Sequence, residues 1–131
     1  MSTMDSHEFT SLMHRLAHAW NTGDANAAAD CFTTDAIYVE PGDRQRYVGR
    51  AEIFALSGGQ APPPMAMTWH SLVFDGAQQL GCGEYTFRGR RQYHGLVITQ
   101  LRDGRISRWR EYQYPSESDW TEFIGDSHFE S

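Results

Sequence analysis

The stretch Leu-Arg-Asp-Gly-Arg-Ile-Ser-Arg-Trp-Arg-Glu-Tyr-Gln-Tyr, residues 101–114, decides the fold of this chain. Asp103-Gly104 is a strong two-residue hairpin signal, because a type I′ turn needs positive φ at both of its central positions. After the turn, side chains alternate between the two faces of a strand. One face carries Ser107, Trp109, Glu111 and Gln113. A carboxylate beside a tryptophan on an inner face predicts the wall of a polar pocket.

Outward from this hairpin, the C-terminal half reads as an antiparallel meander, because segments of alternating polarity are separated by turn residues. The predicted strands are Met65–Phe74, Leu80–Arg88, Tyr93–Arg102 and Arg105–Tyr114. The turns between them are Asp75-Gly76, Gly89-Arg90 and Asp103-Gly104. Pro115-Ser116 ends the sheet, and Ser118–Ile124 is expected to form a last helical turn that docks back on the body.

The N-terminal half is predicted to begin with helices. Asp5 or Ser6 can cap a first helix in which apolar side chains recur at helical spacing. These side chains are Phe9, Leu12, Met13, Leu16 and Trp20. Gly23 suits the left-handed position after that helix, and Asp24 can cap a short second one.

The middle of the chain is predicted to hold a strand, a third helix and a loop. Thr33–Asp35 reads as a turn before a strand over Ala36–Glu40, and residues 43–48 as a polar excursion or a short strand. A third helix is expected after Gly49-Arg50. Gly58–Pro64 is rich in glycine and proline, which makes it either a mobile flap or a plain connector.

Composition limits the class of protein. A chain of 131 residues, 40% of them hydrophobic, predicts a single domain over residues 1–131. The net charge of −6 argues against nucleic acid or an anionic membrane as the main partner. Cys31 and Cys82 lie in no CxxC pair and imply no disulfide framework. No ligand-spaced metal motif is present, so no metal or cofactor is expected. The polar N-terminus and the lack of a long apolar run predict a cytoplasmic protein.

Helices followed by a long meander indicate an α+β fold. Four motifs follow one another along the chain: Trp20–Asp24, Cys31–Tyr38 with Glu40-Pro41, Gly49–Ile53, and Asp103–Tyr112. Motifs in this order are similar to the NTF2-like superfamily, in its SnoaL-like and ketosteroid-isomerase-like branch. The resemblance implies a cone-shaped barrel, in which N-terminal helices pack in the concave face of a curved, mixed but mainly antiparallel sheet. It also implies a homodimer through the outer sheet face. It does not define an activity, because the fold hosts isomerases, dehydratases, cyclases, epoxide hydrolases and non-catalytic carriers.

The resemblance to ketosteroid isomerases implies one catalytic residue and excludes the rest of that mechanism. Those enzymes place a carboxylate just before a proline on the first strand, which matches Glu40. Their two oxyanion donors fall at Leu16 and near Leu96, and leucine cannot donate a hydrogen bond. Steroid-type isomerisation is therefore not expected.

The resemblance to two other enzyme groups implies further candidates. SnoaL-like cyclases place an acid/base carboxylate on the last strand and a histidine on the strand before it, which resemble Glu111 and His94. Scytalone dehydratases use two inward histidines with a carboxylate, and His70 and His94 could fill those places. His94 and His70 could equally be hydrogen-bonded structural histidines, and Glu111 could be a surface or dimer-interface residue.

Pairing outward from two-residue turns predicts which residues share a face. Glu111 then lies opposite Leu96, and Gln113 lies opposite His94. A tight turn at Gly89-Arg90 adds Tyr85 to this inner face, and one at Gly76-Ala77 puts His70 opposite Gly83. A slip of one residue would bring Glu84 inside in place of Tyr85. The residues left for the outer face are Val97, Thr99, Leu101, Ile106, Tyr112 and Tyr114.

These residues support three hypotheses. In the first, the chain is a cofactor-independent acid/base enzyme that cyclises, dehydrates or isomerises a small hydrophobic molecule, with Glu111, His94 and Glu40 as catalytic residues. In the second, the same pocket binds a small hydrophobic ligand without chemistry. In the third, the outer face carries a structural or interaction role. The candidate ligand-binding residues are Trp20, Tyr38, His70, Tyr85, Trp109 and Gln113.

Overall fold

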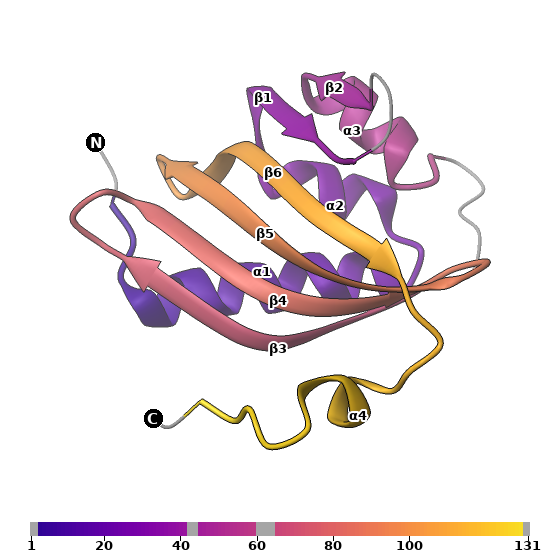
Figure 1. The fold of residues 1–131 in the computed structure, drawn as a ribbon. Coiled ribbons are helices and arrows are strands. Elements are labelled where there is room, and N and C mark those ends of the chain that lie inside the picture. The colour runs from indigo at the N-terminus through magenta and orange to yellow at the C-terminus, as the bar shows by residue number, and fades with distance from the viewer. Residues whose placement is uncertain (1–2, 42–44, 60–64, 130–131) are drawn as a thin grey trace.

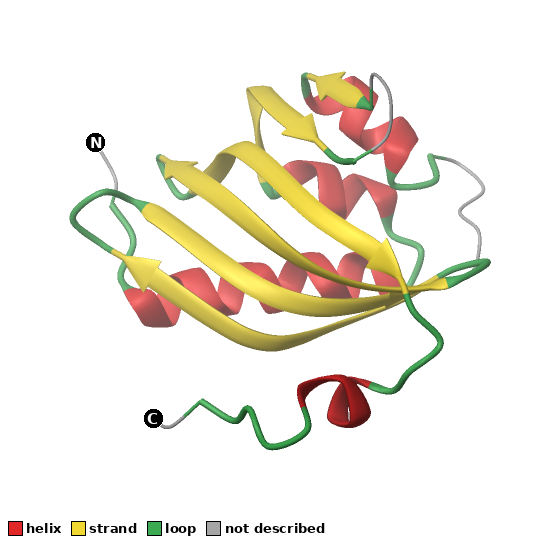
Figure 2. Cartoon of the chain, viewed as in Figure 1, coloured by secondary structure: helices red, strands yellow, loops and turns green. Residues whose placement is uncertain are grey.

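A computed structural model describes residues 3–41, 45–59 and 65–129, and it shows three helices against one face of a curved sheet (Figure 1). The helices are α1 (Ser6–Asn21), α2 (Ala25–Asp30), α3 (Arg50–Leu56) and α4 (Trp120–Ile124). The strands are β1 (Phe32–Val39), β2 (Arg46–Val48), β3 (Ala66–Asp75), β4 (Leu80–Arg88), β5 (Gln92–Arg102) and β6 (Arg105–Pro115). The predicted α+β order is therefore confirmed (Figure 2).

The sheet has the strand order β2-β1-β6-β5-β4-β3 and curls without closing. β1 runs parallel to β6, and every other neighbouring pair is antiparallel. α1 crosses the concave face, while α4 lies over the opposite face (Figure 1). No helix in the described parts of the chain has the length and hydropathy that crossing a membrane requires.

The N-terminal helices begin and pack as the sequence predicts. The Asp5 carboxylate accepts from the amide of Glu8 at 2.8 Å, and the Glu8 carboxylate accepts from the amide of Asp5 at 3.1 Å, which together form a capping box. Asp24 caps α2 through the amide of Ala27 at 3.0 Å. The apolar stripe of α1 is buried against the sheet, at Phe9, Leu12, Met13, Leu16 and Trp20.

The β5–β6 hairpin has the predicted turn but not the predicted register. Asp103 and Gly104 adopt φ values of 52° and 78°, and Arg102 pairs with Arg105 across them. A β-bulge then makes Ser107 an extra residue, because Leu101 pairs with Ile106 but Gln100 pairs with Arg108. Every pair beyond the bulge is shifted by one residue.

This shift reverses the predicted faces of β5. Val97, Thr99 and Leu101 point inward and are buried, as is Ile106 of β6, so the prediction that they lie on the outer face is wrong. Leu96 is 39% exposed on the outer face instead of lining the interior. Tyr112 and Tyr114 lie outside, as predicted.

A second difference from the predicted register cancels the effect of the bulge at Tyr85. The β4–β5 loop has three residues between Arg88 and Gln92 rather than two, so Tyr85 pairs with Gly95. Because Gly95 pairs with Gln113, Tyr85 stays on the face that carries Glu111. Glu84 therefore points to the other face, where it accepts from Ser71 at 3.0 Å.

Two further predictions about local structure are wrong or lie outside what the structure describes. Thr33–Asp35 is no turn but part of β1, whose pairing with β6 shifts register between Phe32 and Ile37. The Thr33 hydroxyl donates to Asp35 at 2.9 Å within this irregular stretch. The flap predicted for Gly58–Pro64 falls largely on residues 60–64, which lie outside the described residues.

Glycine at position 81 is predicted to be needed for the packing of α1 on the sheet. A Cβ atom at Gly81 would overlap the Phe9 ring, which is stacked on Phe74. Gly81→Ala should therefore lower the free energy of unfolding by about 1–3 kcal/mol, measured by chemical denaturation. Gly76→Ala is the matched control, because its new methyl group would meet only an ordinary contact at 3.7 Å. Equal stability of the two variants would contradict this packing.

Candidate active site

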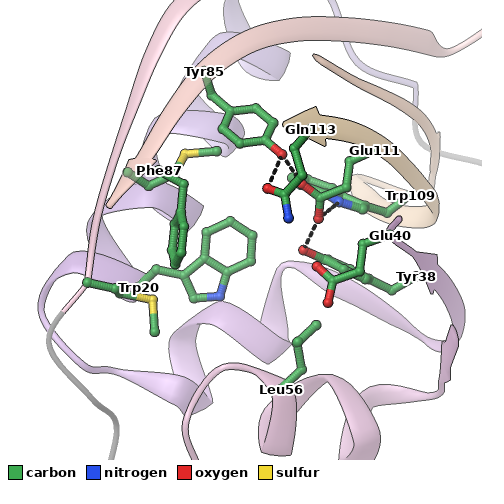
Figure 3. A pocket seen from close by; sticks show the side chains of 11 residues that line it. Trp20, Tyr38, Glu40, Leu56, Tyr85, Phe87, Trp109, Glu111 and Gln113 are labelled. Carbon is green, nitrogen blue, oxygen red and sulfur yellow. Dashed lines mark hydrogen bonds between the residues drawn. The ribbon is translucent and has the colours of Figure 1, made fainter. Parts of the chain in front are cut away.

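A cavity of about 100 Å³ lies between the helices and the concave face of the sheet (Figure 3). Its lining comes from α1, α3 and four segments of the sheet. The lining residues are Trp20, Tyr38, Glu40, Leu56, Met65, Met67, Tyr85, Phe87, Trp109, Glu111 and Gln113. Most of the wall is aromatic or aliphatic, and the polar groups gather at one end. Five of the six predicted ligand-binding residues thus line one cavity.

The polar end is organised around the buried carboxylate of Glu111, which is 6% exposed. Its Oε1 accepts from the Tyr38 hydroxyl at 2.6 Å and from the Trp109 indole at 3.1 Å. Its Oε2 accepts from the Tyr85 hydroxyl. Figure 3 shows these side chains converging on the carboxylate from β1, β4 and β6. Three protein donors thus converge on the one carboxylate of Glu111.

Glu40 lies beside Glu111 because of the parallel pairing between β1 and β6. Tyr38 pairs with Trp109 and Val39 with Arg110, which brings the next residue of each segment, Glu40 and Glu111, close together. The two carboxyl groups interact through a hydrogen bond. An ionised carboxylate has room for about four hydrogen bonds, and three protein donors plus the proton of Glu40 fill them.

Burial raises the pKa of Glu40 from its ordinary value of 4.5 to about 7, and the charge of Glu111 and the hydrogen bond to Glu111 act in the same direction. A hydrogen bond from Tyr47 partly opposes this shift of the pKa. Two carboxyl groups in contact cannot both ionise easily, so the pair retains one proton to near-neutral pH. Glu40 is therefore the group in this cavity that gains and loses a proton around pH 7.

Two stacked aromatic side chains hold the carboxyl pair in place. The Tyr38 ring lies on the Trp109 ring at 5.2 Å with 9° between the planes. The Trp20 ring meets Trp109 edge-on at 5.7 Å, and its indole donates to the hydroxyl of Ser57 at 2.9 Å. Trp20 thus forms a fixed wall across the cavity from the carboxyl groups (Figure 3).

Burial increases from one side of the cavity to the other. Tyr38, Tyr85, Trp109 and Glu111 are buried, whereas Leu56, Met65, Phe87, Gln113 and Glu40 are half-buried. The half-buried residues, Glu40 among them, therefore form the mouth, and the buried Glu111 lies deeper. A molecule that enters the cavity would reach Glu40 before Glu111.

The prediction that His94 shares a face with Glu111 is wrong, because the bulge at Ser107 pairs His94 with Tyr114. On the outer face, His94 contacts the hydroxyl of Thr86 at 2.9 Å and the carbonyl of Ser118 at 2.8 Å. His70 is the extra residue of a bulge in β3, which turns it away from the cavity as well. Its Nε2 lies 2.6 Å from the Thr86 hydroxyl, and its ring stacks on Trp120 at 4.1 Å.

Sequence reasoning missed two residues that support the site. Tyr47 of β2 pairs with Tyr38 and hydrogen-bonds Glu40. Gly95 leaves the space that the Tyr85 hydroxyl occupies, since a Cβ atom there would lie 2.6 Å from it. A signal for the carboxyl pair was present in the chain: an aromatic residue lies two positions before each glutamate, at Tyr38-x-Glu40 and Trp109-x-Glu111.

The described residues contain no group of three or more His, Cys, Asp or Glu side chains arranged to hold a metal ion. Among the described residues that line the cavity, Glu40 and Glu111 supply the carboxyl groups. The chemistry that these residues can supply directly is proton transfer.

The SnoaL-like domain family matches residues 13–109 of this chain. The match ends two residues before Glu111. No curated protein matches the chain.

Solved structures share the fold at low sequence identity. An NTF-2 like protein of unknown function from Burkholderia xenovorans LB400 is 21% identical, with a TM-score of 0.72 over 95% of this chain and 97% of that one. An LEH-like epoxide hydrolase of M. tuberculosis is 20% identical, with a TM-score of 0.71 over 83% of this chain and 84% of that one. The epoxide hydrolase/cyclase-like enzyme SalBIII is 15% identical, with a TM-score of 0.73 over 84% of this chain and 93% of that one. The NTF2-like fold predicted from the sequence is thereby confirmed.

The raised pKa of Glu40 predicts a pH-dependent stability that needs no substrate to measure. Glu40 binds its proton more tightly in the folded chain than in the unfolded chain. The protonated side chain therefore adds to the free energy of unfolding below pH 4.5, and this contribution is lost as the pH rises to about 7. The stability of the wild type relative to Glu40→Gln should therefore fall across this window, as measured by denaturant unfolding at several pH values. Glu122→Gln, at an exposed site on α4, is the control and should show no such slope. A constant difference between wild type and Glu40→Gln would contradict the assignment.

Proposed function

The chain belongs to the SnoaL-like domain family, and from its cavity we propose that it is a cofactor-independent acid/base enzyme acting on a small hydrophobic molecule. The reaction class is cyclisation, dehydration or isomerisation. The observation that carries this proposal is the contact between Glu40 and Glu111 at the polar end of an otherwise apolar cavity.

The two glutamates suit different roles. Glu111 is bonded to three donors and is held too firmly to approach a substrate. Glu40 is half-buried at the mouth side, and its pKa of about 7 lets it exist in both protonation states at neutral pH. General acid/base catalysis is most efficient when the pKa of the group lies near the working pH. We therefore assign proton transfer to Glu40 and the positioning of its proton to Glu111.

This assignment covers the three reaction classes with one group. Protonated Glu40 can donate to a substrate hydroxyl that leaves as water, or to a ring oxygen that opens. Ionised Glu40 can remove a proton from a carbon next to a carbonyl or from an attacking hydroxyl. In dehydration the proton donated by Glu40 leaves in the water, and Glu40 regains one from the carbon next to the departing hydroxyl. In isomerisation the proton taken from one carbon is returned to another, and in cyclisation the attacking hydroxyl loses a proton while the opened ring oxygen gains one. No co-reactant is required. Pyran ring formation, in which the structural neighbour SalBIII takes part, is a reaction of the cyclisation class.

The cavity supports a particular kind of substrate. Its volume of about 100 Å³ is below that of the engineered cavity of about 150 Å³ that admits benzene, so the reacting end of the molecule enters and any larger part remains at the mouth. The described lining residues include two carboxyl groups and no Lys, Arg or His. An anionic group would therefore be repelled, and a neutral oxygen function is favoured.

A second candidate function is the binding of a small hydrophobic ligand without chemistry. It is favoured by one observation: the hydroxyl protons of Tyr38 and Tyr85 are both directed to Glu111. Neither hydroxyl is then free to polarise a substrate oxygen, which an oxyanion hole would require.

Substitution of the two glutamates tests the enzyme proposal. Small neutral epoxides, enones and β-hydroxyketones would be incubated with the protein and the products identified by mass spectrometry. We expect Glu40→Gln to lower kcat/KM by about 10²-fold or more while the affinity for the same compound changes little. Glu111→Gln should move the inflection of the pH–rate profile below 7, because removing the neighbouring charge lowers the pKa of Glu40.

The fold should tolerate Glu111→Gln. The amide oxygen can accept from Tyr38 and Trp109, and the hydroxyl of Tyr85 can turn to the Oε1 of Gln113, which lies 3.0 Å away. Turnover at the wild-type rate in both variants would contradict the enzyme proposal. Binding of a compound without turnover by the wild type would favour the second candidate function.

A further inference from the structure

A groove of about 610 Å³ lies on the outer face of the sheet, opposite to the face that carries the candidate active site. Its floor comes from β3 and β4, and its wall comes from residues 117–129, a segment that we call the strap (Figure 1). Sites for small molecules in proteins have volumes of about 300–1,000 Å³, so this groove has the size of a ligand site.

The bulge in β3 supplies the polar floor of the groove. Trp69 pairs with Tyr85 and Ser71 pairs with Glu84, which leaves His70 as the extra residue. The rings of Trp69 and Tyr85 meet 5.8 Å apart on the inner side of the sheet. The residues after Trp69 are turned to the outer face, where His70 and Ser71 line the groove together with Glu84. A bulge thus re-aims side chains and gathers three polar groups in one place.

Two histidines hold the strap on the sheet, so the wall of the groove is formed before a ligand arrives. The ring of His94 donates to the carbonyl of Ser118 at 2.8 Å. The ring of His70 lies flat on the indole of Trp120, with 4.1 Å between the ring centres and 6° between the planes. Both contacts join the beginning of the strap to the strands beneath it.

Glu84 is a carboxylate without a cationic partner on this floor. Its side chain is half-buried, and it accepts from the hydroxyl of Ser71 at 3.0 Å. No ion pair among the described residues includes Glu84. Burial lowers the pKa of the neighbouring His70 from its ordinary value of 6.5, so that ring is neutral at pH 7. The groove therefore has a place for a positive charge that the described part of the chain does not fill.

The strap side of the groove suits the same kind of charge. Trp120, Phe123 and Phe129 line it, and Phe129 is 77% exposed. The face of an aromatic ring attracts a cation. The described lining residues include no Lys or Arg. Residues 116–131 carry Asp and Glu side chains but no Lys or Arg, so the field of the strap also favours cations.

We propose that this groove binds a small organic cation, an amine or quaternary ammonium compound with an apolar body. The charged head lies at Glu84, and the apolar body lies along the aromatic side chains of the strap. An anion of the same shape is repelled by the carboxylate. The sheet separates this site from the cavity that holds Glu40 and Glu111, so the proposal is independent of the acid/base function.

Binding of benzyltrimethylammonium tests this site, with phenylmethanesulfonate as an anion of similar shape. Each compound would be added at millimolar concentrations to the ¹⁵N-labelled protein. The signal of the Trp120 indole N–H would be followed by NMR, after its assignment by comparison with Trp120→Phe. We expect the cation to shift this signal until it saturates and the anion to leave it unchanged.

Variants of the floor and of the wall separate the two contributions to binding. Glu84→Gln should raise the dissociation constant of benzyltrimethylammonium about fivefold or more, because the attraction of one charge at close range is lost. The new amide oxygen can still accept from Ser71, so the floor keeps its hydrogen bond. Phe129→Leu should raise the dissociation constant about two- to fivefold, because the ring is lost while the apolar volume remains.

Glu52→Gln is the matched control for the change in net charge. Glu52 is exposed on α3, on the other side of the sheet, and its replacement can still accept from the amide of Val48. The dissociation constant should therefore stay at the wild-type value. A Trp120 signal that does not move with the cation would overturn the proposal. Equal affinity of the wild type for the cation and the anion would also overturn it, as would equal dissociation constants for Glu84→Gln and Glu52→Gln.

Discussion

The need to satisfy one buried charge organises this protein. An unpaired carboxylate in an apolar interior costs several kcal/mol, so Glu111 must be bonded on every side or be protonated. Three donors from three strands meet that need: Tyr38, Tyr85 and Trp109. Each donor is also a large aromatic side chain of the core, so the same contacts that satisfy the charge fix the shape of the cavity.

The same constraint gives Glu40 its chemical character. Parallel pairing of β1 with β6 places it level with Glu111, where burial, the neighbouring charge and the hydrogen bond to Glu111 raise its pKa to about 7. A lone carboxyl group in this apolar cavity could gain or lose its proton without changing the charge of a second group. Two in contact must share a proton, and a shared proton near neutral pH is what an acid/base enzyme requires.

The sequence predicted the elements of this structure better than their register. Caps at Asp5 and Asp24, the helical stripe of α1 and the turn at Asp103-Gly104 are local features that short stretches of chain determine. Bulges at Ser107 and His70 depend on how whole strands pack, and no residue type announces them. One extra residue in a strand moves every later side chain to the other face, which is why His94 was expected inside and lies outside.

The residues of the site could be predicted only in part, because strand register decides which side chains face the cavity. Tyr85 was placed correctly because the bulge at Ser107 and the longer β4–β5 loop shift the register in compensating ways. Glu40 and Glu111 were both candidates, but their contact crosses from the first strand to the last, and no local pairing rule connects them. The most direct measurement is a titration of the side-chain carboxyl carbons by ¹³C NMR, with Glu40 assigned by comparison with Glu40→Gln. The account predicts that the Glu40 resonance titrates near pH 7, whereas titration near its ordinary value of 4.5 would contradict the shared proton on which the account rests.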